Sequence, residues 1–528
     1  MTAAPPLLAD RTKTGPDPAS GRPYLLRCPV CQESYQDDGL RLDCAMAHRP
    51  GLLRTEYATS FAPAPGSGPF RYRCWLPTRG QVLPEGSGGA TYRAERLGRA
   101  LGLKELWVAF SGYWPERGAT LTTGSFKELE AQAVLARLPE RPPVLVVASA
   151  GNTAAAFQRV CSDQGVECVL VVPDAALPAL AAAGERADCV RLVTVAGDYS
   201  DAIELADAIA TRPGFQAEGG TRNVARRDGL GTAFLSAAET IGRLPDHYVQ
   251  AVGSGAGAIA AHEAARRLLA NGMPGSKRVP VPDRTPEPPA RAAASACAAA
   301  SACAAASDGK HALPSGASTR SGAMEAGTTE SGATGSGPTG SGATGSGPTG
   351  SGPTGSGAID VRLGGLPQLT LCQNTDYAPM FHAWQNGSAE PDVGSESATR
   401  AAVARAYARE LTTRTPPYAV AGGVREILAE SGGELRVADR AEAVAAARLF
   451  ADAEGIDIEP AAAVAVAGLR QAVAAGRIRP EETVLLHVTG GGRARRRAAT
   501  RAPVATGPDL SIPAGLDVRA AADLVTGA

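Results

Sequence analysis

Lysine is scarce in this sequence, and one lysine stands where an amine could do chemistry. The 528 residues contain five lysines and 47 arginines. Lys127 follows the small-residue turn TGSF and precedes ELE, a run that predicts a helix beginning near the lysine. Arginine stays protonated, whereas a lysine with a lowered pKa attacks carbonyl carbon or removes protons. An ordinary surface lysine is the alternative, and the turns described next favour amine chemistry at Lys127.

The segment SAGNT is suited to binding a carboxylate. It contributes Ser149, Gly151, Asn152 and Thr153, follows an apolar run and opens a predicted helix. Free backbone N–H groups and the helix dipole attract anions at such a position. The same segment is equally a good N-cap turn without any ligand.

A glycine-rich turn later in the chain is suited to binding a phosphate. Gly253, Ser254, Gly255, Ala256 and Gly257 follow an apolar strand-like run and precede a helical run. Closely spaced glycines let several N–H groups converge on one phosphate. A dinucleotide site is the competing interpretation, but no acidic residue with a ribose-binding context follows about twenty residues later. A single phosphate is therefore favoured.

Thr489 and two arginines are further candidates for contacts to a ligand. Thr489 directly follows the apolar run 483–488 and precedes three glycines. Its hydroxyl could form a hydrogen bond with a ring nitrogen of a ligand. An ordinary turn at the end of a strand is the alternative. Arg117 and Arg222 are candidates for binding anionic substrate groups, because arginine pairs well with phosphate and sulfonate. A solvated surface position is the alternative for both arginines.

The N-terminal region contains a possible metal site. Cys28 and Cys31 form a CxxC knuckle, and Cys44 and His48 follow as CxxxH. Three thiolates and one imidazole are compatible with tetrahedral zinc. A small β module with free thiols is the alternative.

Strand-like and helical runs alternate through the middle of the chain. Apolar runs at 144–148, 168–173 and 190–196 predict buried strands, and each is followed by a helical pattern. Near-continuous apolar strands separated by helices are typical of parallel sheets covered on both faces. The sequence therefore predicts an α/β fold.

Composition divides the chain into five parts, and only some of them predict a packed core. Pro-, Ala- and Gly/Ser/Thr-rich stretches indicate disorder, because they bury too little apolar area to offset ordering entropy. The predicted parts are a disordered tail (1–20), a small cysteine-containing module (21–60), a catalytic region of two α/β subdomains (61–273 and 359–493, the smaller subdomain at about 130–245), a disordered insertion (274–358) and an irregular tail (494–528).

Bulk properties exclude some partners. The net charge of -1 gives no reason to expect nucleic acid or an anionic membrane as partner. No apolar stretch is long enough to span a bilayer, and the N-terminus lacks the order of a secretory signal. Ten scattered cysteines fit reduced thiols. The expectation is a cytoplasmic protein without membrane or nucleic-acid partners.

Taken together, the motifs resemble pyridoxal-phosphate enzymes of the tryptophan synthase β-like fold (fold type II). Within that fold they are most similar to the cysteate synthase family, a relative of threonine synthase. The similar segments are TGSFKELEA around Lys127, SAGNT, GSGAG, the C-terminal TGGG, FSGYWPERGA at 110–119, and parts of 373–385 and 454–462. The resemblance covers about residues 22–273 and 359–493, and the insertion departs from the compact family form.

The resemblance implies a two-domain fold, the cofactor pyridoxal 5'-phosphate and roles for the candidate residues. Lys127 would hold the cofactor and move the substrate α-proton, the 253–257 turn would bind the cofactor phosphate, SAGNT the substrate carboxylate, Asn152 the ring oxygen and Thr489 the ring nitrogen. The implied reaction is β-replacement, which converts O-phospho-L-serine and sulfite into L-cysteate and phosphate. A homo-oligomer is expected from the fold type.

Two other functions stay open from sequence alone. One is another replacement enzyme or lyase of the same fold, such as threonine synthase acting on phosphohomoserine, because a methylene difference between substrates is weakly encoded. The other is a non-catalytic scaffold. Lys127, Asn152 and Thr489 together argue against a scaffold, which needs none of them.

Overall fold

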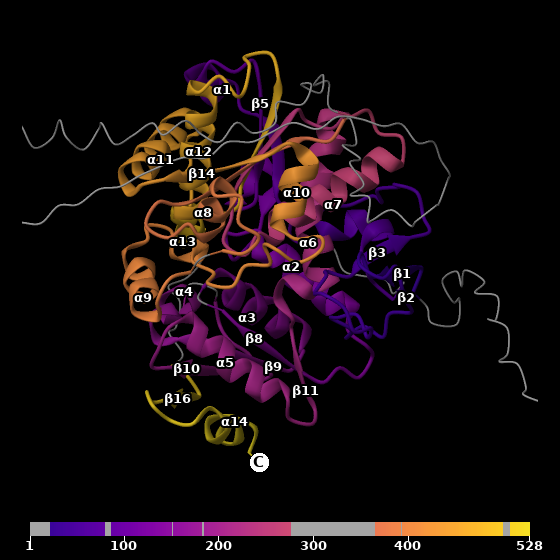
Figure 1. Cartoon of the computed structure of the whole chain (residues 1–528), viewed down its shortest axis with the longest axis vertical. Helices are drawn as coiled ribbons and strands as arrows, with labels where there is room; N and C mark the ends of the chain where they lie inside the picture. The colour runs from indigo at the N-terminus through magenta and orange to yellow at the C-terminus, as the bar shows by residue number, and fades with distance from the viewer. Residues whose placement is uncertain are drawn as a thin grey trace, which may run out of the picture. The chain divides into compact units, whose positions relative to one another are not determined.

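Two α/β sheets and one small antiparallel module organise the chain (Figure 1). The computed structural model describes residues 22–79, 86–149, 151–181, 184–275, 365–391, 393–499 and 507–527. The predicted tail 1–20 and nearly all of the predicted insertion 274–358 lie outside the described residues. The fold below therefore concerns the remainder of the chain.

The larger sheet has six strands, and its carboxyl edge supports the candidate site. The strand order is β14 (Glu434–Ala438), β13 (Gln368–Asn374), β12 (His247–Ala251), β15 (Thr483–Val488), β5 (Glu105–Phe110) and β4 (Ala90–Arg93). All neighbours are parallel except the edge strand β4, which is antiparallel to β5. Every residue of β12, β13 and β15 is buried, as expected for parallel strands covered on both faces.

Helices bury both faces of this sheet. One core combines the sheet with α1 (Glu95–Leu101), α11 (Arg440–Glu454) and α12 (Pro460–Ala474). The other combines it with α6 (Val224–Ile241), α7 (Ala256–Ala270), α8 (Pro379–Gln385) and α10 (Val424–Ser431). Burying a leucine or valine contributes about 1.5–3 kcal/mol, so the buried side chains of these two cores stabilise the larger sheet.

The smaller sheet has five parallel strands. Their order is β11 (Phe215–Ala217), β8 (Val144–Ala148), β9 (Cys168–Pro173), β10 (Val190–Val195) and β16 (Leu510–Ile512). One face packs on α2 (Lys127–Arg137), α3 (Asn152–Gln164) and α4 (Leu177–Ala181). The other packs on α5 (Tyr199–Ala210) and α14 (Val518–Thr526), the yellow helix below α5 in Figure 1. The predicted parallel α/β architecture is confirmed.

The prediction of an irregular tail over 494–528 is wrong for its described part. Helix α13 (Arg493–Ala499) continues from the last strand of the larger sheet, and β16 extends the smaller sheet beside β10. Helix α14 buries Ala521, Ala522 and Val525 against that sheet. A three-residue strand and a nine-residue helix are too short to form alone. They form because they pair with an edge that the local sequence does not reveal.

The N-terminal module is a three-stranded antiparallel sheet bound to the rest of the molecule by a buried ion pair. Its strands are β1 (Tyr24–Arg27), β2 (Ser34–Tyr35) and β3 (Arg54–Tyr57). Asp37 pairs with Arg137, the last residue of α2, through oxygen–nitrogen contacts of 2.7 and 2.9 Å. Tyr24 donates a 2.6 Å hydrogen bond to the same carboxylate. The module therefore contacts the helix that begins with Lys127.

The remaining described elements are short. They are the hairpin β6 (Tyr113–Trp114) and β7 (Ala119–Thr120), α9 (Glu396–Arg405), and the 3-10 turns η2 (Pro69–Trp75), η3 (Pro115–Arg117), η4 (Asp174–Ala176), η5 (Gly220–Arg222) and η6 (Arg409–Leu411). Across the described ranges, no helix combines the length and apolar character needed to cross a membrane.

The chain returns almost to the same point after residues 276–364. A β-carbon placed on Gly275 would lie 3.0 Å from the Cα atom of Gly365. Just before this point, the Leu244 N–H donates a 2.9 Å hydrogen bond to the Pro274 carbonyl. Gly275 and Gly365, the described residues on either side of segment 276–364, therefore lie next to each other beside the larger sheet.

Candidate active site

Lys127 begins helix α2, and the turn before it is hydrogen-bonded to the end of strand β15. The Phe126 N–H donates to the Thr489 carbonyl at 2.9 Å, and the Gly491 N–H donates to the Gly124 carbonyl at 3.0 Å. Gly124 has a φ of 77°, a left-handed conformation that glycine adopts without strain. These reciprocal bonds bring Thr489 to the start of α2, although most of the chain separates the two segments.

The amine of Lys127 is paired with a buried carboxylate. Lys127 Nζ lies 3.1 Å from Glu130 Oε2, one turn along the same helix. Burial lowers the pKa of Lys127 below its usual value, against the opposing attraction of the Glu130 carboxylate. A lysine with a lowered pKa is more readily deprotonated, as nucleophilic attack on a carbonyl requires.

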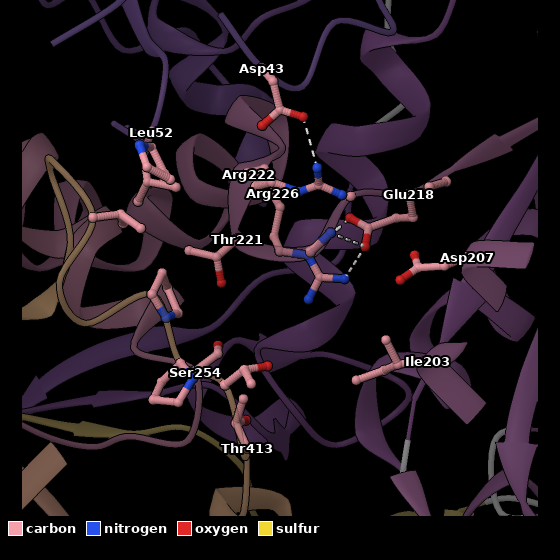
Figure 2. Close-up of a pocket in the computed structure, with 18 of the residues that line it drawn as sticks. Asp43, Leu52, Ile203, Asp207, Glu218, Thr221, Arg222, Arg226, Ser254 and Thr413 are labelled. Atoms are coloured by element: carbon pink, nitrogen blue, oxygen red, sulfur yellow. Dashed lines mark hydrogen bonds and ion pairs between the residues drawn. The ribbon is translucent and has the colours of Figure 1, made fainter. Parts of the chain in front are cut away.

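Glu130 is shared between the lysine and an arginine. Arg226 NH1 lies 2.9 Å from Glu130 Oε1, and Thr153 donates a 3.0 Å hydrogen bond to that oxygen. The guanidinium also pairs with Glu218 (Figure 2). Both acids and the arginine are buried, so the charges stabilise one another where water cannot.

The glycine-rich turn follows β12, opens α7 and lines the same pocket as Lys127. Gly255 has a φ of 81° and is the residue before the helix. A β-carbon on Gly253 would lie 2.8 Å from the Glu410 carbonyl oxygen, and one on Gly257 would lie 2.5 Å from Gln250 Nε2. Side chains at these positions would therefore clash. The Ala256 N–H donates to Ser254 Oγ at 3.4 Å. The positive end of the 15-residue α7 dipole also lies at this turn, where it attracts an anion.

The SAGNT segment opens α3 on the other side of the lysine. Ser149 Oγ accepts hydrogen bonds from the Gly151 N–H at 3.1 Å and the Ala154 N–H at 3.0 Å. Asn152 donates through Nδ2 to Glu459 at 2.6 Å. Burial raises the pKa of Glu459, although the Arg493 guanidinium opposes this effect.

One pocket brings together eleven of the thirteen residues predicted to bind cofactor or substrate. Its lining includes Lys127, Ser149, Gly151, Asn152, Thr153, Gly253, Ser254, Gly255, Ala256, Gly257 and Thr489. These residues come from both α/β sheets and from segments far apart in the sequence. Such convergence of an amine, an amide, a hydroxyl and two helix N-termini is the arrangement that the motifs predicted.

The two predicted arginines do not line this pocket. The Arg117 guanidinium stacks on the rings of Tyr92 and Trp114, 4.3 and 4.7 Å from their centres. Arg222 pairs with Asp43 at 2.7 Å and lines a neighbouring cavity (Figure 2). Both guanidiniums are thus occupied by protein groups away from Lys127.

The structure adds charged residues that the sequence analysis missed. Glu130, Glu459 and Arg226 surround the lysine and asparagine, and Arg409 lines the same pocket from η6. Glu130 lies three residues after Lys127, a spacing that places both on one helix face and could have identified it. No local signal marks Arg409, because its position depends on how an irregular segment folds over the site.

The residues of the pocket fit pyridoxal phosphate. A lysine with a lowered pKa suits its aldehyde, the glycine turn at the N-terminus of α7 suits its phosphate, and Asn152 and Thr489 offer polar groups for its ring. The individual roles predicted for these residues stay predictions.

The predicted metal-binding residues also converge. The ligand atoms of Cys28, Cys31, Cys44 and His48 all lie within 4.8 Å of one another. This cluster is part of the N-terminal module and is separate from the Lys127 pocket.

Comparisons with known proteins agree with this site. The family described as pyridoxal-phosphate dependent enzyme matches residues 83–334 and 339–490, well over half of the chain. A cysteate synthase from Methanosphaerula palustris is 40% identical over 480 residues, which cover 89% of this chain and 90% of the relative. A cysteate synthase from Methanospirillum hungatei is 37% identical over 478 residues, covering 90% and 91%.

A solved structure is similar at lower identity. Threonine synthase from Escherichia coli aligns with a TM-score of 0.49 and 13% identity over 81% of this chain and 79% of that chain. An alignment at this level does not distinguish between substrates. The family match and the close relatives are decisive: the chain belongs to the cysteate synthase family of pyridoxal-phosphate-dependent enzymes.

Proposed function

We propose that this enzyme catalyses β-replacement on O-phospho-L-serine, with sulfite as nucleophile and L-cysteate and phosphate as products. The relatives are cysteate synthases, which supports the product, and the pocket supports the chemistry. The observation that carries the proposal is the convergence of Lys127, the SAGNT turn, the glycine turn and Thr489 in one pocket.

The residues of the pocket divide the work. When bound, pyridoxal phosphate supplies an electron sink that makes the α-proton of the amino acid removable. Lys127 Nζ takes that proton and later returns it to the α-carbon, a role that its lowered pKa favours. The N–H groups at the start of α3 hold the substrate carboxylate.

The bond changes balance without a redox partner. The carbon–oxygen bond at the β-carbon breaks, and phosphate leaves with the bonding electron pair. The sulfur lone pair of sulfite then forms the new carbon–sulfur bond at the same carbon. Water must be kept from the β-carbon between these events, and a pocket lined by residues of both α/β sheets limits its access.

Two anionic groups need a cationic partner in this pocket, and Arg409 is suited to the role. Arg226 is already paired with Glu130 and Glu218. Arg409 lines the pocket, and its carbonyl accepts a 2.7 Å hydrogen bond from Thr412. Its guanidinium forms no hydrogen bond or ion pair with another described residue. A free guanidinium binds phosphate or sulfite through two parallel N–H donors. We assign Arg409 as the residue that binds the leaving phosphate or the incoming sulfite.

The test compares two substrates on the full chain loaded with pyridoxal phosphate. Release of phosphate and the mass of the product are followed with O-phospho-L-serine, with and without sulfite, and with O-phospho-L-homoserine. We expect cysteate from phosphoserine plus sulfite. Threonine from phosphohomoserine, with no cysteate formed, would identify a threonine synthase and overturn the proposal.

Two lysine variants test the assignment of Lys127. Lys127→Ala should lose the visible absorbance of the bound cofactor and reduce turnover by about 100- to 10,000-fold or more, because proton transfer and cofactor attachment are both lost. Lys104→Ala is the matched control, since Lys104 is an exposed lysine of the described chain outside the pocket. Cofactor absorbance that survives in Lys127→Ala contradicts the assignment.

A further inference from the structure

Four potential metal ligands of the N-terminal module point at a common centre. Cys28 and Cys31 come from the turn after β1, and Cys44 and His48 come from the loop before β3. His48 Nε2 lies 3.3 Å from Cys28 Sγ and 3.1 Å from Cys44 Sγ, and Cys31 Sγ lies 3.6 Å from Cys44 Sγ. Zinc bonds of about 2.0–2.3 Å in a tetrahedron place ligand atoms about 3.5–3.8 Å apart, close to this spacing.

The imidazole of His48 is oriented for coordination. Its Nδ1 lies 2.6 Å from the Arg49 carbonyl oxygen. A carbonyl oxygen only accepts hydrogen bonds, so Nδ1 carries the proton and Nε2 presents a lone pair toward the sulfurs. Most metal-bound histidines donate the N–H of their other ring nitrogen to a carbonyl, carboxylate or water, which fixes the tautomer in this way.

The CxxC turn has a backbone suited to thiolate ligands. Gln32, directly after Cys31, has a φ of 62°, and it is the one residue other than glycine with positive φ among those described. The Gln32 N–H donates to the Cys28 carbonyl at 3.1 Å, and the Cys28 N–H donates to the Glu33 carbonyl at 2.9 Å. The Val30 N–H also points at Cys28 Sγ, at 3.4 Å. Left-handed backbone at a bulky residue costs free energy, and a bound ion that requires the turn would offset this cost.

We propose that Cys28, Cys31, Cys44 and His48 bind one structural zinc ion. Three thiolates and one imidazole are soft and intermediate donors that select zinc over calcium or magnesium. Four protein ligands complete a tetrahedron and leave no position for substrate, so the ion stabilises the module and takes no part in the reaction.

The zinc would hold one wall of the cavity beside the Lys127 pocket. Asp43, Cys44 and His48 line that cavity, and Asp43 pairs across it with Arg222 (Figure 2). Tyr199, Arg226, Ser254 and Thr413 line both this cavity and the Lys127 pocket. Folding of the loop that carries Cys44 and His48 therefore shapes the space adjoining the site.

The test measures metal in the full chain purified without chelators. Wild-type protein should contain about one zinc per chain, and protein exchanged into Co²⁺ should show thiolate-to-cobalt charge transfer in the near ultraviolet. Cys31→Ser, at an exposed ligand, should lower the zinc content and abolish the cobalt band. Cys189→Ser is the matched control, because Cys189 lies outside the cluster.

The outcomes separate this proposal from misfolding and from the proposed reaction. Circular dichroism and cofactor absorbance report whether Cys31→Ser is folded, and Cys44→Ser provides a second ligand variant. Zinc content equal in Cys31→Ser, Cys44→Ser and Cys189→Ser would overturn the proposal. So would metal-free wild-type protein that gives no cobalt–thiolate band, whether or not cysteate is formed.

Discussion

The environment of Lys127 explains how a partly buried lysine can be reactive. Glu130 compensates its charge at 3.1 Å, and Arg226 in turn compensates Glu130 at 2.9 Å. Because Arg226 also pairs with Glu218, the network balances two cations with two carboxylates. The lysine can therefore lose its proton without leaving an unpaired arginine behind.

Arg409 should control anion affinity more than the rate of chemistry. Arg409→Gln removes a charged donor worth about 1.5–3 kcal/mol, so KM for phosphoserine or sulfite should rise by about 10- to 100-fold. Steady-state kinetics with each substrate varied in turn show which anion it binds. Arg405→Gln, on the exposed end of α9, is the control. Kinetics of Arg409→Gln that match this control would contradict the assignment.

At the scale of residues, sequence identified chemistry only where a local motif carries it. Lys127, Asn152 and the 253–257 turn lie at helix starts that short patterns predict, and all of them line the pocket. Arg117 and Arg222 do not line this pocket. Arginine is abundant here, and no local pattern distinguishes a guanidinium that reaches a site from one that stacks on Tyr92 and Trp114 or pairs with Asp43. Arg409 was missed for the same physical reason.

Helix α2 connects the N-terminal module to the active site. It begins at Lys127 and ends at Arg137, whose guanidinium is paired with Asp37 of the module. Arg22 NH2 also donates a 2.8 Å hydrogen bond to the Arg137 carbonyl at the end of the helix. Both ends of α2 are therefore bound to segments remote in sequence, which holds the lysine in place.

Breaking the Asp37–Arg137 pair should destabilise the protein strongly. Asp37→Asn leaves the buried Arg137 charge uncompensated, at a cost of about 3–5 kcal/mol. Asp163→Asn removes an exposed pair with Arg159 on α3 and should cost no more than about 0.5 kcal/mol. Denaturant titration at neutral pH measures both. Equal effects of the two changes would contradict a buried pair.

The same pair predicts a loss of stability in acid. Burial raises the pKa of Asp37, but hydrogen bonds and charge from Arg137 more than offset this, so its pKa in the folded state is lowered. A lowered pKa contributes stability above the unfolded value of about 3.9, and this is lost as pH falls through the folded value. The free energy of unfolding should therefore fall below about pH 4, and less steeply in Asp37→Asn.

Helix α14 shows an element that only tertiary contact stabilises. Val525 is buried against the smaller sheet, whereas its neighbour Leu524 is 61% exposed. Val525→Asp should lower the free energy of unfolding by the value of valine burial, about 1.5–3 kcal/mol or more, and detach α14 from the sheet. Leu524→Asp should change the free energy of unfolding little. Hydrogen exchange at β16 and β10 reports undocking. Protection at β16 that persists in Val525→Asp would contradict this packing.

At the scale of the whole molecule, the order of strands and helices was predictable and the pairing of distant segments was not. Periodicity located β8, β9, β10 and β15 almost to the residue, because each is a continuous apolar run. The addition of β16 to the smaller sheet needs a contact across some 300 residues, which one sequence alone does not encode locally. The spacing of Cys28, Cys31, Cys44 and His48 along the chain likewise does not show that their ligand atoms meet, because the fold of the N-terminal module brings them together.

The meeting of Gly275 and Gly365 predicts that the segment between them can be shortened. Replacing residues 276–364 with a short Gly/Ser linker should leave turnover unchanged and raise the free energy of unfolding by up to about 2 kcal/mol, because a shorter loop loses less entropy on closure. Thermal unfolding and the cysteate assay measure these effects. A fall in stability or loss of bound cofactor would show that the segment supports the fold.

The hydrogen bonds between the Lys127 turn and the end of β15 set an order of events during synthesis. The ribosome makes Phe126 several hundred residues before Thr489, yet the 2.9 Å bond between them is part of the site. A nascent chain stalled before residue 489 can fold its smaller sheet only in part and lacks one side of the pocket. Capture of the cofactor must therefore wait until residue 489 has been made, and products truncated before it should be colourless.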